Sequence, residues 1–145
     1  MEKILFLCGN NAARSQMAEG LAKRELAGRF EIYSAGVQPL AIHPMTREVM
    51  KEIEIDLSQQ KSKPIKEVPW KEMNLIVTLC GASSNSLPPL PPTIKRLHWP
   101  VPDPMTMSSH YGHKKTPEAQ KEAFKEVREM ILKRINDFKL SLPPL

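Results

Sequence analysis

The chain has few cysteines, no hydrophobic run long enough to cross a membrane, and no strong excess of charge of one sign. Only Cys8 and Cys80 are cysteines among 145 residues, and no Cys-x-x-Cys pair occurs, which excludes a disulfide scaffold and a cysteine-rich zinc site. No apolar stretch approaches the ~20 residues of a membrane span, and the start Met1-Glu2-Lys3 lacks the apolar segment of a signal peptide. We therefore expect a cytoplasmic protein that does not associate with a membrane.

Composition and charge are those of an ordinary soluble domain. Apolar residues make up 41% and charged residues 26% of the chain, which argues against disorder. The 21 Lys and Arg against 16 Asp and Glu give a net charge of +5, which favours anionic partners. This charge is too mild and too evenly spread for a nucleic-acid-binding surface. We expect one domain over residues 1–145, acting as a monomer.

Buried strands are predicted where continuous apolar runs end at small or turn-forming residues. They are expected over residues 4–7, 30–34 and 75–79, with a weaker candidate over 94–99. Helices are expected from Arg14 to the stop at Gly28, from Pro44 through Ile53, and from Pro117 with Thr116 as N-cap. The last helix has an apolar stripe formed by Phe124, Val127, Met130, Ile131, Ile135 and Phe138.

Strands that alternate with helices predict an α/β fold with a mostly parallel sheet, which binds ligands beyond the carboxyl ends of its strands. Cys8 and Cys80 each follow directly after a predicted strand, so both belong at that edge. If the two strands are neighbours, they are ~4.8 Å apart, and a disulfide between the cysteines is feasible. The alternative is that each cysteine is a small buried apolar residue.

The segment Cys8-Gly9-Asn10-Asn11-Ala12-Ala13-Arg14-Ser15 has the pattern Cys-x5-Arg-Ser between a predicted strand and a helix start. Such a loop can point backbone N–H groups at a tetrahedral oxyanion, and the helix N-terminus adds positive potential. Arg14 offers a planar fork that binds two oxygens, and the same surroundings favour a thiolate at Cys8. These residues, Cys8 to Ser15, are therefore the predicted substrate-binding loop.

The other residues of this loop have the sizes and polar groups that the site requires. Gly9, Ala12 and Ala13 are small enough for the backbone to approach an anion closely. Asn11 tolerates left-handed backbone angles and can tie the loop together through its amide. Ser15 can donate its hydroxyl to the Cys8 sulfur.

The stretch Cys8–Gly20 resembles the arsenate reductases built on the low-molecular-weight tyrosine phosphatase fold, of the thioredoxin-coupled type or a close relative. The likeness continues, in order, through Tyr33-Ser34-Ala35-Gly36, Ile55-Asp56-Leu57-Ser58, Val77-Thr78-Leu79-Cys80, and His98-Trp99 with Asp103-Pro104. It implies a three-layer fold with an open four-stranded sheet and helices on both faces. It also implies four catalytic residues: Cys8 as nucleophile, Arg14 as oxyanion clamp, Asp103 as general acid, and Cys80 as the second redox cysteine.

The resemblance also bears on metal binding. Asn11, Glu19 and Ser34 match oxygen ligands of a monovalent cation in some family members, where the fourth ligand is an aspartate. The aligned residue here is Lys63, whose ammonium is able to take the place of the cation. His110 and His113 have a spacing that could suit a metal, whereas His43 and His98 suit a helix start and a loop contact. We expect no bound metal or other resident cofactor.

Three reactions suit a cysteine in an oxyanion loop. A phosphatase needs Cys8, Arg14 and Asp103 but has no need of Cys80. The segment that follows Asp103 is Pro104-Met105-Thr106-Met107, which lacks the tyrosines typical of phosphatases of this fold. A phosphocysteine carrier needs neither Asp103 nor Cys80. Arsenate reduction requires two electrons, which a second thiol supplies. Reduction of arsenate to arsenite is therefore favoured, with weak phosphatase activity as a side reaction and phosphate or sulfate as competitors.

The reductant is left open by the sequence. Thioredoxin-coupled relatives carry a third cysteine where this chain has Leu87, and a glutathione-coupled branch carries one where it has Ala82. We therefore expect a Cys8–Cys80 disulfide that an external thiol reduces directly, either thioredoxin or glutathione with glutaredoxin.

Overall fold

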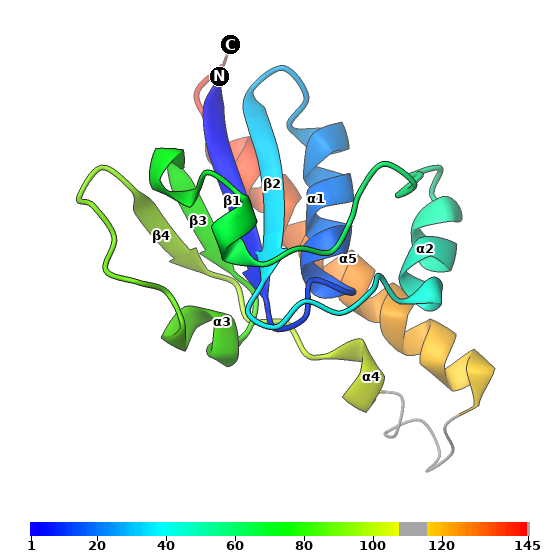
Figure 1. The fold of residues 1–145 in the computed structure, drawn as a ribbon. Helices are drawn as coiled ribbons and strands as arrows, with labels where there is room; N and C mark the ends of the chain where they lie inside the picture. Colours follow the sequence, from blue (N-terminus) through cyan, green and yellow to red (C-terminus); the bar gives the residue numbers. More distant parts are fainter. Residues whose placement is uncertain (108–115, 145) are drawn as a thin grey trace.

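Four parallel strands form one sheet in the computed structural model, which describes residues 1–107 and 116–144. The sheet order is β2-β1-β3-β4 (Figure 1). The strands are β1 (Glu2–Cys8), β2 (Phe30–Gly36), β3 (Leu75–Thr78) and β4 (Lys95–His98). Every neighbouring pair of strands is parallel, so the predicted parallel α/β sheet is confirmed. The strand with the weaker sequence signal, over residues 94–99, is present as β4.

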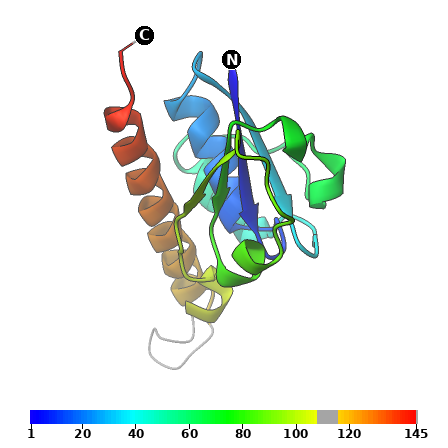
Figure 2. The ribbon, with the colours of Figure 1, turned by 90° about the vertical axis from the view of Figure 1, so that its left-hand side faces the viewer.

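Long helices cover one face of this sheet. They are α1 (Arg14–Glu25) and α5 (Pro117–Ser141), with the shorter α2 (Pro44–Lys51) packed beside them (Figure 2). The core on this side contains Ile4 and Phe6 of β1 and the buried side chains of α1 and α5. Thr116 caps α5, because its hydroxyl accepts from the Ala119 N–H at 3.1 Å. The predicted start of this helix is therefore confirmed.

Met130 corrects the predicted apolar stripe of α5. It is 40% exposed, whereas Val127, Ile131 and Ile135 are fully buried. These three residues follow one another at intervals of four positions and form the side of the helix that faces the core. Met130 lies beside that buried side of the helix. Its side chain borders a surface hollow together with Lys133 and Arg134.

The other face of the sheet is covered by short elements that the sequence did not predict. These are the 3-10 turns η1 (Ile65–Glu67) and η2 (Trp70–Glu72), and the short helix α3 (Gly81–Asn85). A smaller core lies beneath them, formed by Leu5 and Leu7 of β1 with Val68, Ile76 and Ile94. The three-layer arrangement is confirmed, although the described layer on this face of the sheet contains only short helical turns and no long helix.

None of the helices within residues 1–107 and 116–144 is long and apolar enough to cross a bilayer. His110 and His113, whose spacing could suit a metal, lie outside the described residues.

Candidate active site

The two cysteines lie at the carboxyl edge of the sheet, at the ends of adjacent strands. Cys8 is the last residue of β1, and Cys80 follows β3 by two residues. The two strands pair with Leu7 opposite Thr78, and the Leu79 N–H donates to the Leu7 carbonyl at 2.8 Å. Both cysteines are free thiols, with Cys8 buried and Cys80 partly exposed. The question of whether their strands are neighbours, which the sequence left open, is thereby answered.

The carbonyl oxygens of the loop after Cys8 are held by the surrounding chain. Those of residues 8, 9, 10 and 12 accept from the N–H groups of Val37, Gln38, Leu40 and His43, at 2.9–3.2 Å. The carbonyl of residue 11 accepts from the Gln16 side chain at 3.0 Å. Because carbonyl and N–H groups alternate along a chain, these bonds leave N–H groups of the loop available for an anion.

Gly36 is required by the close approach of this loop. A Cβ on Gly36 would lie 2.8 Å from the backbone nitrogen of Asn11 and 2.9 Å from the carbonyl carbon of Asn10. Both atoms belong to the backbone, so the loop would have to move. In the sequence, Gly36 stands out only as part of the Tyr33–Gly36 stretch of the family resemblance, and no local signal separates it from Gly81, where an added Cβ would have no neighbour within 4 Å.

We expect Gly36→Ala to weaken phosphate binding by about tenfold, because overpacking of this kind costs roughly 1–3 kcal/mol and acts on the anion loop itself. Calorimetric titration with phosphate measures the change, and Gly81→Ala is the matched control. Equal phosphate affinity in both variants would show that the loop tolerates displacement.

The Cys8 sulfur accepts two hydrogen bonds, and the side chain and backbone of Asn11 determine which groups donate them. The Asn11 backbone N–H donates to the sulfur at 3.2 Å, with Asn11 at φ 51° as its sequence suggested. The Asn11 amide also donates to Ser15 Oγ at 2.7 Å and to Ser34 Oγ at 3.0 Å. Each hydroxyl is therefore free to donate onward: Ser15 to Cys8 Sγ at 2.9 Å, and Ser34 to Glu19 at 2.5 Å. These bonds place stabilising donors at the sulfur.

Lys63 lies beside the buried Glu19 carboxylate, at the place where the resemblance implies a cation. Its Nζ is 3.8 Å from Glu19 Oε1 and donates to the Lys61 carbonyl at 3.0 Å. Lys23 contacts the other Glu19 oxygen at 2.6 Å. Burial lowers the pKa of Lys63 below its ordinary value, and Glu19 partly offsets this. Two ammonium groups therefore face one carboxylate here.

We expect Lys63→Met to lower Tm by roughly 4–8 °C. The substitution removes one of the two positive charges that face the buried Glu19 carboxylate, which should lower the free energy of unfolding by about 2 kcal/mol. Thermal unfolding followed by circular dichroism checks this. Lys61→Met, which removes an exposed ammonium two residues away, is the control. A Lys63→Met protein as stable as this control would mean that Lys23 suffices.

A pocket of about 180 Å³ opens onto the anion loop. Cys8, Ala13, Arg14 and Asp103 all border it, so the residues predicted from distant parts of the chain come together. Asp103 precedes the short helix α4 (Pro104–Met107), and its carboxylate accepts from the Met105 N–H at 2.9 Å. Arg14 donates to the Val101 carbonyl at 3.2 Å, which ties the clamp to the segment that carries Asp103.

Cys80 is the N-cap of the short helix α3. Its sulfur accepts from the Ser83 N–H at 3.4 Å, and Ser83 Oγ donates to the Cys80 carbonyl at 2.9 Å. Arg96 of β4 holds the helix by donating to the Ser84 carbonyl at 2.7 Å. Moving the Cys80 thiol would require these hydrogen bonds of the five-residue helix to break, a local opening that leaves the sheet intact.

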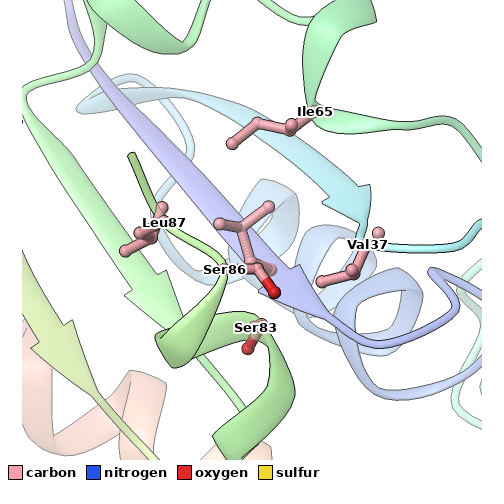
Figure 3. Close-up of a pocket in the computed structure, with 7 residues that line it drawn as sticks. Val37, Ile65, Ser83, Ser86 and Leu87 are labelled. Atoms are coloured by element: carbon pink, nitrogen blue, oxygen red, sulfur yellow. The ribbon is translucent and has the colours of Figure 1, made fainter. Parts of the chain in front are cut away.

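The two positions where relatives carry a further cysteine are separated from the Cys8 pocket. Ala82 is exposed on α3. Leu87 borders a second cavity of about 240 Å³ on the opposite face of the sheet, where Figure 3 shows it with Val37 and Ile65. Neither the Ala82 nor the Leu87 side chain has a thiol that could pass a disulfide onward.

The two histidines of the described part are both hydrogen-bonded. His43 caps α2, as predicted, with Nδ1 accepting from the Met45 N–H at 3.0 Å. His98 ends β4, within the segment 94–99 expected as a strand, and its Nδ1 is 2.7 Å from Thr78 Oγ1. The described residues contain no group of three or more His, Cys, Asp or Glu arranged to hold a metal ion.

Comparison with known proteins gives consistent matches over nearly the whole chain. The family model "low molecular weight phosphotyrosine protein phosphatase" matches residues 3–143. Arsenate reductase 1 of Staphylococcus haemolyticus is 39% identical over 139 residues, covering 96% of each chain. A solved arsenate reductase in the phosphate binding state has a TM-score of 0.74 at 30% identity, covering 99% of this chain and 100% of that one. A thioredoxin-dependent arsenate reductase of Corynebacterium glutamicum has a TM-score of 0.70 at 26% identity, covering 98% of this chain and 64% of that one.

Proposed function

Because this chain belongs to the low molecular weight phosphotyrosine protein phosphatase family, we propose that it uses the family's oxyanion loop to reduce arsenate to arsenite. Cys8 is the nucleophile, and the loop of residues 8–15 with Arg14 holds the arsenate oxygens. Asp103 protonates the departing oxygen, and Cys80 is the second thiol. The site uses no resident metal or cofactor.

The reaction proceeds in two chemical steps. The Cys8 thiolate attacks arsenic, an S–As bond forms, and one oxygen leaves as water with a proton from Asp103. The Cys80 thiolate then attacks the Cys8 sulfur, so that an S–S bond forms and the S–As bond breaks with its electron pair left on arsenic. Arsenic(V) becomes arsenite, and two thiols become one disulfide.

The single observation that carries this proposal is the second free thiol at the end of the strand next to β1. A phosphatase has no use for Cys80, whereas arsenate reduction needs two electrons from thiols. Beside the anion loop, the described residues that line the pocket include Leu40, Ala41 and Met105, and none of the lining residues in this part of the chain is a Phe, Tyr or Trp that could hold a phenyl ring.

A phosphatase is the second candidate, because Asp103 borders the same pocket as Cys8. Thiol titration before and after a single turnover distinguishes the two. Loss of two thiols with arsenate supports the reductase, whereas phosphate release from a phenyl phosphate without thiol loss supports the phosphatase.

The reductant that regenerates the enzyme is an external thiol that attacks the Cys8–Cys80 disulfide itself, since Ala82 and Leu87 offer no internal relay. The two candidates are thioredoxin, and glutathione with glutaredoxin. The similar arsenate reductase of Corynebacterium glutamicum is described as thioredoxin-dependent, which supports thioredoxin. Arsenate turnover with each system in parallel assigns the reductant.

We expect iodoacetamide at neutral pH to label Cys8 faster than Cys80. The hydrogen bonds from Asn11 and Ser15 and the charge of Arg14 stabilise negative charge on the Cys8 sulfur. Saturating phosphate should slow labelling of Cys8 but not of Cys80. Peptide mass spectrometry over time measures both rates, and equal rates without phosphate would contradict the assignment of the nucleophile.

A further inference from the structure

His43 borders the pocket that contains Cys8 and Asp103, although its place at the start of α2 explains it as a helix cap. Its backbone N–H donates to the Ala12 carbonyl of the anion loop at 3.0 Å. Its ring packs on Phe124 of α5, with ring centroids 5.0 Å apart. The backbone of His43 is therefore tied to the anion loop, while its imidazole packs on α5 and borders the pocket.

The cap determines which ring nitrogen carries the proton. Nδ1 accepts from the Met45 N–H at 3.0 Å, and a nitrogen that accepts a hydrogen bond carries no proton. The neutral ring therefore has its proton on Nε2. Burial lowers the pKa of His43 below its ordinary 6.5, so this neutral form is present at neutral pH.

Nε2 is a donor without a protein acceptor among residues 1–107 and 116–144. Within the same residues, every fully enclosed side-chain nitrogen or oxygen has a hydrogen-bond partner. Nε2 is therefore not enclosed: it is accessible, on a ring that borders the pocket.

We propose that His43 is a further oxyanion-binding residue, whose Nε2–H donates to one oxygen of the arsenate or phosphate in the Cys8 pocket. This inference rests on the proposed function and adds a donor from the start of α2 to those of the loop and of Arg14 on α1. The donor is neutral, so it binds an oxygen while Nδ1 continues to cap α2. One imidazole thus links the fold of α2 to the binding of the anion.

The test is His43→Asn. Asparagine is a good N-cap and keeps an acceptor for the Met45 N–H, but its short amide cannot reach the place of Nε2. We expect phosphate affinity to fall about tenfold, since a hydrogen bond to a charged group is lost. The Tm without phosphate should stay close to that of the parent, and the KM for arsenate should rise more than kcat falls. His98→Asn, at the end of β4, is the matched control.

Nitrogen chemical shifts of ¹⁵N-histidine provide a readout that a purely structural role would not move. Phosphate should shift Nε2 of His43 and leave His98 unchanged. If His43→Asn binds phosphate as tightly as the parent, or if Nε2 does not shift, the inference is overturned while the proposed function stands. If the parent protein neither binds phosphate nor loses two thiols with arsenate, the proposed function falls and this inference with it.

Discussion

Cys80→Ser is expected to stop arsenate turnover while leaving the first chemical step intact. Cys8, its loop and Asp103 remain in place, so the Cys8–arsenate adduct should still form. Without the second thiol, nothing in the chain attacks the Cys8 sulfur, and turnover with a dithiol reductant should fall by at least about a hundredfold. Serine is itself a good N-cap, so α3 should keep its hydrogen bond from the Ser83 N–H.

Mass spectrometry of arsenate-treated protein measures this result. The parent should give a species two hydrogens lighter, with Cys8 and Cys80 in linked peptides, and Cys80→Ser should not. Cys8→Ser serves as the control that forms neither adduct nor disulfide. If Cys80→Ser turns over at the parent rate with glutathione, an external thiol resolves Cys8 and the role proposed for Cys80 is wrong.

Arg14→Lys should weaken phosphate and arsenate binding by roughly 10- to 100-fold. A lysine keeps the charge but replaces a planar fork, which binds two oxygens, by a single ammonium. Losing one charge-assisted hydrogen bond costs about 1.5–3 kcal/mol, which corresponds to that range. The bond to the Val101 carbonyl, which holds the segment before Asp103, is lost as well.

Phosphate titration of the variant and of Arg24→Lys provides the comparison. Arg24 is also on α1, but it pairs with Glu25 on the surface away from the pocket. Unchanged phosphate affinity in Arg14→Lys would mean that the loop has been assigned wrongly.

The edge of the sheet was predictable because its signals are local. Continuous apolar runs that end at Cys8 and at Leu79 mark strands buried on both faces, and the carboxyl ends of parallel strands meet at one edge. The helix after Cys8 was equally clear from the spacing of Met17 and Leu21, both fully buried. Local periodicity therefore predicted the edge of the sheet at which the two cysteines lie.

What the sequence could not predict depends on contacts between distant segments. Gln16 and Glu19 lie outside the apolar stripe of α1, yet both are buried, because Gln16 bonds to the Asn11 and Lys61 carbonyls and Glu19 to Ser34. The need for Gly36 arises only when β2 approaches the loop. The short helix α3 has too few apolar residues to show a helical period, and its cap is a cysteine.

The way in which the loop carbonyls are held has a consequence for the order of folding. Residues 8–15 are contiguous, but most of their carbonyl partners lie in residues 37–46, and Ser62 adds a further bond to the Asn10 carbonyl. A nascent chain that ends before these segments has the whole Cys-x5-Arg-Ser motif and yet lacks the contacts that shape it. Competence to bind an oxyanion should therefore arise late, with the docking of the segment after β2, and Cys8 should behave as an ordinary thiol until then.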